Sequence, residues 1–177
     1  MHPYGCGTAG PVGGLGTDRL CRTTWYRRAG AQRPDVPLPK GTAMAAALSD
    51  DLKKLLDSPI FVILATIQPD GSPQVSPVWC KRDGDDVLIS TTIGRQKEKN
   101  TRRDPRVSVL VQPPDAPYTY AEIRGNAMLS TEGGPELIEE LSRKYTGKPY
   151  AEFNPASVND AQRVVVRVTP RKVVGSI

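Results

Sequence analysis

The chain has 177 residues, 24 Lys and Arg against 19 Asp and Glu, and a formal net charge of +5 at pH 7. This length suits one domain with a single hydrophobic core. The only histidine, His2, lies at the start, so the rest of the sequence cannot build a Ser-His-Asp triad, a Cys-His pair or a histidine metal site, and we predict no bound metal. No apolar run reaches the roughly 18 residues that a membrane-spanning helix requires.

Residues 1–43 have a composition unlike that of the rest of the chain. They hold six Lys and Arg, two Asp and Glu, and eight of the 16 glycines, with little apolar periodicity. Such a segment cannot bury enough apolar surface to offset the entropy of ordering, so we predict a disordered, basic, Gly-rich extension. Met44 resembles a natural start. We therefore expect residues 1–43 to be an extension of the reading frame and residues 44–177 to be the folded domain.

The expected folded part contains one cysteine, Cys80, which cannot form an internal disulfide and indicates a reducing compartment. A secretory apolar segment is absent from the sequence. We therefore predict a cytoplasmic protein that does not bind membranes.

The first predicted elements of this part are a helix and a hairpin. Ser49 suits an N-cap, and the leucines that follow it at helical spacing predict a helix over 49–58. The β-branched apolar run 60–67 predicts a strand buried on both faces. Residues 69–72, Pro-Asp-Gly-Ser, form a turn sequence, because proline presets φ and glycine allows positive φ. Residues 73–81 are therefore expected to pair back on the first strand.

The remaining elements alternate strands with one short and one long helix. The predicted strands are, in chain order, 87–92, 106–111, 118–130, 163–168 and 172–175. Gly125 lies inside the third of these and indicates a bulge or a close approach of two backbones. Apolar spacing predicts the longest helix over 135–146, and the irregular segment 148–160 follows it. Six or seven strands in a meander, with three helices, predict a mainly β (α+β) fold: a small antiparallel barrel with peripheral helices.

The most specific local chemistry lies in the segment 90–106. Gly94 opens a short predicted helix whose first turn holds Arg95 and Lys97. A helix N-terminus already carries partial positive charge and unpaired N–H groups, so cations there indicate a bound anion such as a phosphate monoester or diester. The candidate donors to that anion are Ser90, Thr91, Thr92, Arg95, Gln96, Lys97 and Asn100, of which the residues at 96, 97 and 100 share one side of the helix.

Two other interpretations of the basic residues remain open. The first is a solvated basic helix between two strands, and no Gly-rich P-loop spacing is present to decide against it. The second is a nucleic-acid binder. Residues 44–177 hold 18 Lys and Arg and 17 Asp and Glu, so this part is nearly neutral and we predict no nucleic-acid partner.

Four motifs are recognisable in the expected folded part. They are Leu-Ala-Thr-Ile and Pro-Asp-Gly-Ser-Pro within 64–73, Val-Ser-Pro-Val-Trp at 75–79, Ser-Thr-Thr-Ile-Gly-Arg-Gln-Lys at 90–97 and Asn-Thr-Arg-Arg-Asp-Pro-Arg-Val-Ser-Val at 100–109. Together they resemble the flavin- and deazaflavin-binding split β-barrel proteins related to pyridoxamine 5′-phosphate oxidase. Residues 122–125 and 139–145 resemble the deazaflavin branch. The resemblance implies an antiparallel split β-barrel that forms a homodimer, with cofactors at the subunit interface.

The resemblance also implies which residues hold the cofactor. Those implied to line the flavin ring or its ribityl chain are Ser76, Pro77, Val78 and Trp79. Those implied to bind the phosphate are Ser90, Thr91 and Lys97. Gln96 stands where the family usually has an arginine, with Arg95 one place earlier, so either of these two residues could contact the phosphate. Tyr120 matches a position that reaches the ring from a second subunit, and a packing role stays open for both Trp79 and Tyr120.

In such a protein the coenzyme performs the redox chemistry and the chain supplies binding and orientation. The predicted function is an F420H2-dependent oxidoreductase that transfers a hydride from the reduced deazaflavin, coenzyme F420, to a small unsaturated organic acceptor. The alternatives are an FMN-binding oxidase or reductase of the same fold and a non-catalytic flavin or deazaflavin carrier. No catalytic residue is assigned; the candidate proton donors are Tyr118, Tyr120, Tyr150 and water. Segment 148–160 is a candidate lid over the acceptor.

Overall fold

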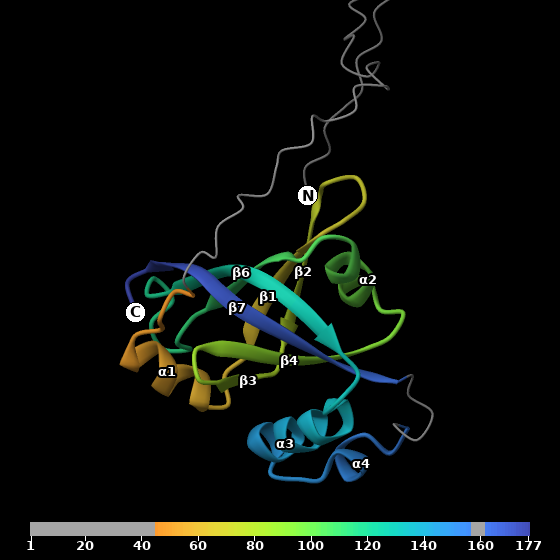
Figure 1. The fold of residues 1–177 in the computed structure, drawn as a ribbon. Coiled ribbons are helices and arrows are strands. Elements are labelled where there is room, and N and C mark those ends of the chain that lie inside the picture. The colour runs from red at the N-terminus through yellow and green to blue at the C-terminus, as the bar shows by residue number, and fades with distance from the viewer. Residues whose placement is uncertain (1–44, 157–161) are drawn as a thin grey trace, which may run out of the picture. The chain divides into compact units, whose positions relative to one another are not determined.

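A computed structural model describes residues 45–156 and 162–177, in which seven strands form one antiparallel sheet that curls into a half-barrel (Figure 1). The strands are β1 (Val62–Ile67), β2 (Pro73–Val78), β3 (Cys80–Asp83), β4 (Asp86–Thr92), β5 (Arg106–Val111), β6 (Ala121–Ser130) and β7 (Arg163–Gly175). The helices of the described residues are α1 (Asp50–Asp57), α2 (Gln96–Arg103), α3 (Gly134–Thr146) and α4 (Tyr150–Phe153). The predicted fold class, an antiparallel split barrel of six to seven strands with peripheral helices, is confirmed. The predicted extension over residues 1–43 lies outside the described residues.

The order of strands across the sheet explains why it curls. The order is β2-β1-β5-β6-β7-β4-β3, so β2 and β3 are the two edge strands. Neighbouring strands lie about 4.8 Å apart, so in a flat sheet these edges would be roughly 29 Å apart. Yet β2 ends at Val78 and β3 begins at Cys80, with only Trp79 between them. The two edges of the sheet must therefore converge at Trp79, which closes the half-barrel at that end.

Three predictions about strands were wrong in detail. Residues 73–81 form two strands rather than one. β2 pairs with β1 at one edge of the sheet and β3 pairs with β4 at the other edge, so the connectivity is not a meander. In β1 only alternate residues are buried, and the other face of the strand is half-exposed. The two predicted strands after residue 162 are one long strand, β7, which continues through Pro170. A proline is tolerated there because it lies at the irregularity in the β6–β7 ladder, opposite Gly125.

The helices follow their local signals closely. The Ser49 hydroxyl accepts a hydrogen bond from the Leu52 N–H (3.2 Å) and caps α1, as predicted. The long predicted helix is α3, which buries Leu137 and Leu141 and ends at Gly147 with φ of 74°. In Figure 1, α1 and α2 lie at opposite ends of the sheet; α3 packs on β4 and β7, and α4 packs on α3. Within the described residues, no helix has the length and apolar character needed to cross a membrane.

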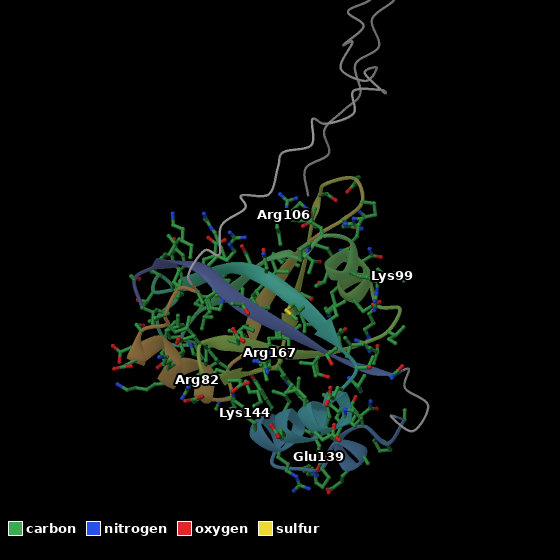
Figure 2. All side chains as sticks on the ribbon, in the orientation of Figure 1. Arg82, Lys99, Arg106, Glu139, Lys144 and Arg167 are labelled. Carbon is green, nitrogen blue, oxygen red and sulfur yellow. The ribbon has the colours of Figure 1, made fainter. Side chains whose placement is uncertain are left out.

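The last turn of α3 fastens the corner where the two edge strands meet. The Tyr145 hydroxyl donates to the Ile60 carbonyl and accepts from the Cys80 N–H (3.1 Å). The Lys144 ammonium donates to the carbonyl oxygens of Leu56 (2.5 Å) and Cys80 (2.8 Å), and it lies between α3 and α1 in Figure 2. Burial raises the pKa of the Tyr145 phenol and lowers that of Lys144. Two polar side chains of one helix thus join the start of β3 to the segment before β1 and to the end of α1.

We expect Tyr145→Phe to lower the free energy of unfolding by about 1–3 kcal/mol, because it keeps the ring but leaves the N–H of buried Cys80 and the carbonyl of Ile60 unpaired. Urea unfolding measures the change. The control is Tyr118→Phe, since Tyr118 is 95% exposed; this variant should stay within about 0.5 kcal/mol of the parent. Equal stability of the Tyr145 variant and the parent would show that the hydroxyl does not hold the corner.

Candidate functional site

Most of the predicted cofactor residues come from three segments of the curled sheet. Ser76, Pro77 and Val78 lie in β2, with Trp79 directly after it; Ser90, Thr91 and Thr92 end β4; Arg95, Gln96, Lys97 and Asn100 lie at and in α2. α2 follows β4 after a short turn and packs on β1 and β6, with Asn100 bonded to Thr66 of β1. The helix therefore links the end of β4 to β1, which is the neighbour of the edge strand β2.

The start of α2 differs from the prediction in one respect. The helix begins at Gln96, and Arg95 is its N-cap residue, with no capping hydrogen bond from its side chain. The first turn also contains an acid, Glu98, which is only 3% exposed. Its carboxylate accepts from the Gly94 N–H (3.1 Å) and from Arg102 Nε (2.8 Å). Although burial opposes ionisation, these two partners lower the pKa of Glu98. The N-terminal turn of α2 therefore carries a buried carboxylate as well as cations.

Lys97 is the residue whose surroundings point most directly to an anion. Its side chain is half-buried, and it makes no hydrogen bond or ion pair with any residue that the structure describes. Burial, followed by the nearby charge of Arg95, lowers the pKa of Lys97. A partly desolvated cation without a counter-ion is unfavourable. A phosphate at the uncapped start of α2 would supply the missing charge and accept from the free N–H groups of the first turn.

Buried hydroxyls of β2 and β4 also lack partners. Ser76 Oγ, Ser90 Oγ and Thr91 Oγ1 are buried and make no hydrogen bond among the described residues, although buried hydroxyls are normally paired. Ser76 and Thr91 face the side of the sheet that carries the main core, whereas Ser90 faces α3 together with Leu88. Because successive side chains of a strand point to opposite faces, Ser90 and Thr91 cannot both reach one phosphate through their side chains. The alternation of β4 puts Ser90 and Thr92 on one face and Thr91 on the other.

Asn100 does not face the start of the helix. Its side chain is 0% exposed, its Oδ1 accepts from Gln96 Nε2 (2.8 Å) and its Nδ2 donates to Thr66 Oγ1 (3.1 Å). The helical spacing placed Gln96 and Asn100 on one side correctly, but the side chains bond to each other. Gln96 itself is exposed, so it can reach a ligand, whereas Asn100 can do so only by breaking both bonds.

The rings around Trp79 form a packed row. Trp79 stacks on Tyr145, with centroids 5.1 Å apart and an interplanar angle of 14°, and packs against Phe153 at 5.2 Å. Tyr145 also meets Phe61 at 5.7 Å. One face of the indole is thus committed to packing on α3, as the packing alternative predicted. Pro77 is exposed on the edge strand β2, where a residue that cannot donate a ladder hydrogen bond is tolerated.

Tyr120 does not lie with this group in a single chain. It precedes β6, which begins one residue later, and is 43% exposed. Ala65, Ser108 and Arg124 pair across β1, β5 and β6, next to the point where α2 docks on Thr66. Tyr120 is four residues before Arg124, roughly 13 Å along the strand. Tyr120 therefore lies away from the docking point of α2 in its own chain, and its contact with the ring from a second subunit stays a prediction.

Two features were not predicted from the sequence. Segment 148–160 contains the short helix α4, while residues 157–161 lie outside the described part. A cavity of about 370 Å³ lies over β1, β5 and β6, and its lining includes Arg106, Arg124 and Arg171 but none of the predicted site residues. Arg106 pairs with Asp104 and Arg124 with Glu122. The three arginines lie in three different strands and are far apart in the sequence. Only the pairing of the strands brings them together, so no local sequence pattern could have predicted this cavity.

Comparison with known proteins agrees with the split-barrel fold. Residues 48–176 match the family described as pyridoxamine 5′-phosphate oxidase. A solved structure named F420 reductase is 31% identical, with 72% of this chain and 98% of that chain covered and a TM-score of 0.61. A conserved hypothetical protein from Mycobacterium tuberculosis is 29% identical, with coverages of 76% and 87% and a TM-score of 0.57. The family match spans most of the chain, and this chain therefore belongs to the pyridoxamine 5′-phosphate oxidase family.

Proposed function

We propose that this protein is an F420H2-dependent oxidoreductase that passes a hydride to a small unsaturated organic acceptor. The observation that carries the proposal is Lys97, a half-buried cation without a counter-ion among the described residues, at the uncapped start of α2. The similarity to a protein named F420 reductase supports coenzyme F420 as the ligand. FMN is the second candidate. The chain belongs to the pyridoxamine 5′-phosphate oxidase family, whose resemblance implied a flavin cofactor, and the phosphate of FMN could occupy the same anion site.

In this proposal the chain binds and orients, and the reduced deazaflavin supplies the hydride when it is bound. Lys97 and Arg95 neutralise the phosphate, and the free N–H groups at the start of α2 donate to its oxygens. Ser76 and Thr91, which face the same side of the sheet, offer hydroxyls that have no partner among the described residues. The free edge of β2 bounds the ring of the cofactor.

The proposed assembly is a homodimer, with the site completed by the second copy. Tyr120 precedes β6, about 13 Å along the strand from the region where α2 docks, so we assign its predicted contact with the ring to a partner subunit. Half-exposed apolar residues on the outer face of the sheet, such as the paired Ile63 and Leu110, offer a surface for that partner. Measuring the molar mass in solution tests the dimer independently of ligand binding.

Fluorescence titration of the purified full chain with F420 and with FMN tests the proposed function. We expect saturable binding of F420, followed by oxidation of F420H2 when an acceptor is present. Binding of FMN with no binding of F420 would replace the first candidate by the second. Binding without turnover over a broad panel of unsaturated acceptors would favour the non-catalytic carrier.

The affinity for the phosphate-bearing cofactor should depend on pH through Lys97. Burial lowers its pKa, so the free protein loses this charge at a lower pH than an ordinary lysine would. Binding requires the charged form, and affinity should therefore fall as the pH rises through the lowered pKa. A titration series between neutral pH and about pH 10 measures the fall. Lys97→Arg should keep its affinity flat over the same range, and a flat profile for the parent protein would contradict the prediction.

We propose that α4 and the segment around it cover the acceptor. Phe153 is 49% exposed and lies against Trp79, the residue that follows the proposed ring-lining strand. We expect Phe153→Ala to raise the KM for the acceptor several-fold while changing the cofactor Kd by less than about twofold. Steady-state kinetics and titration measure the two quantities. The matched control is Phe61→Ala, an exposed ring at the other end of the same row. Equal effects of the two substitutions on KM would rule out the lid.

A further inference from the structure

The helix that carries Lys97 is attached to the sheet in an unusual way. α2 has the sequence Gln-Lys-Glu-Lys-Asn-Thr-Arg-Arg and contains no apolar side chain. Yet Glu98, Asn100 and Thr101 are buried, at 3%, 0% and 3% exposure. By contrast, α1 and α3 dock through buried leucines. Polar contacts must therefore decide how α2 sits on the half-barrel, and hydrogen bonds define direction more narrowly than apolar packing does.

Arg103 at the end of α2 donates to the Ile67 carbonyl of β1, and a chain of three side-chain hydrogen bonds makes the attachment at the buried side of the helix. Gln96 Nε2 donates to Asn100 Oδ1 (2.8 Å), Asn100 Nδ2 donates to Thr66 Oγ1 (3.1 Å), and Thr66 Oγ1 donates to Gln74 Oε1 (2.9 Å). The chain starts at the exposed first residue of α2, passes through the buried Asn100 and Thr66, and ends on β2. Gln74 lies two residues before Ser76, at the start of the strand segment proposed to line the cofactor ring.

We propose that Asn100 and Thr66 are positioning residues, which set α2 against the β1–β2 hairpin so that Lys97 and the strand 76–79 meet the same ligand. The inference rests on the proposed function, and it gives Asn100 a different role from the direct contact that its helical position predicted. Asn100 and Thr66 each donate one hydrogen bond of the chain and accept another. Removing either side chain therefore leaves polar groups of its neighbours unpaired. Helix α2 would then settle differently, and the two halves of the ligand site would move apart.

Asn100→Leu and Thr66→Val remove the middle of the chain at nearly constant volume. We expect each to weaken cofactor binding roughly tenfold, because two hydrogen bonds that orient the site are lost. The matched control is Thr101→Val on the same helix. Thr101 is also buried, but its hydroxyl has no partner among the described residues, so its Kd should stay within about twofold of the parent value. Gln74→Met, at the half-exposed end of the chain, provides a variant that folds if the buried substitutions do not, with an expected loss of about threefold.

A double-mutant cycle separates positioning from general destabilisation. In the parent protein we expect Lys97→Ala to weaken binding by about 10- to 150-fold. In the Asn100→Leu background the same substitution should weaken it by less than about threefold, because Lys97 is no longer aimed at the ligand. In the Thr101→Val background the full effect should remain. A full Lys97 effect in the Asn100→Leu protein would overturn the inference.

Hydrogen exchange of the ligand-free protein supplies a readout that needs no cofactor. Amides of α2 should exchange faster in Asn100→Leu and Thr66→Val than in Thr101→Val, while α3 amides stay unchanged in all three. If the parent protein binds neither F420 nor FMN, the proposed function fails, and this comparison alone then judges the docking of α2. Equal α2 exchange in the test and control variants would overturn the positioning role. Unchanged Kd values in variants of a parent that does bind cofactor would overturn it as well.

Discussion

Lys97→Ala is expected to weaken binding of the phosphate-bearing cofactor by about 1.5–3 kcal/mol, or about 10- to 150-fold in Kd. This is the range for a hydrogen bond that involves a charged group. The reason is specific to this position: the ammonium is half-buried, and it has no competing partner among the described residues. Its interaction with a bound phosphate is therefore screened less than that of a surface cation. Fluorescence titration with F420 and with FMN measures the loss.

The same position should show the opposite effect on the stability of the ligand-free protein. The lowered pKa of Lys97 means that folding disfavours its charged form, so the penalty is fully present below the folded-state pKa, declines as the pH rises through it, and is gone above the ordinary lysine pKa of the unfolded chain. Lys97→Met keeps the apolar stem and removes the charge. We expect it to stabilise the ligand-free protein at neutral pH by up to about 1 kcal/mol while it weakens binding. Urea unfolding without cofactor measures this change.

Lys99 supplies the control for both measurements. It lies on the same helix, is exposed, and is labelled in Figure 2 on the outer part of α2. Lys99→Ala removes an equal charge and should change Kd by less than about threefold and stability by less than about 0.5 kcal/mol. If Lys97→Met destabilises the ligand-free protein, or if both lysines affect binding equally, the anion site at the start of α2 is wrong.

Local chemistry in the sequence predicted local structure well. Ser49 before two aspartates predicted the cap of α1, and Gly147 after an apolar stripe predicted the end of α3, because both signals act within one helical turn. The turn at 69–72 is confirmed for the same reason, with Gly71 at φ of 86°. The resemblance to a known family, carried by motifs spread over 64–109, predicted the split barrel itself.

What the sequence could not predict depends on contacts between distant segments. Trp79 looks like the middle of one strand, and only the closure of the sheet makes it the corner between two edges. Asn100 shares a helix face with Lys97, yet its amide turns inward to Thr66, which is 34 residues earlier in the chain. The charge count at the start of α2 did not show that Glu98 folds back on Gly94. Each of these choices is made by tertiary packing, which outweighs local spacing.

Gly125→Ala is expected to have the largest effect on stability of the substitutions considered, about 2–4 kcal/mol. A Cβ at this position would lie 2.3 Å from the Thr169 carbonyl oxygen, which is part of the β7 backbone and cannot rotate away. The close approach occurs at the irregularity where Arg124 pairs with Lys172 but Gly125 pairs with Pro170, so that Arg171 is an extra residue in β7. Relief of the clash would have to separate the two longest strands of the sheet. Urea or thermal unfolding measures the loss.

Gly84 distinguishes this steric argument from a general effect of replacing glycine. Gly84 has φ of 62°, and a Cβ added there would have no heavy atom within 4 Å, so Gly84→Ala meets backbone strain without a clash. It should cost about 1–2 kcal/mol. Gly84→Asn should recover part of that loss, because asparagine tolerates the left-handed region. Gly125→Asn should recover nothing, since any Cβ meets the same oxygen. If Gly125→Ala proves less destabilising than Gly84→Ala, then β6 and β7 are further apart at the bulge than the structure has them, and the tight β6–β7 pairing that shapes the half-barrel is wrong.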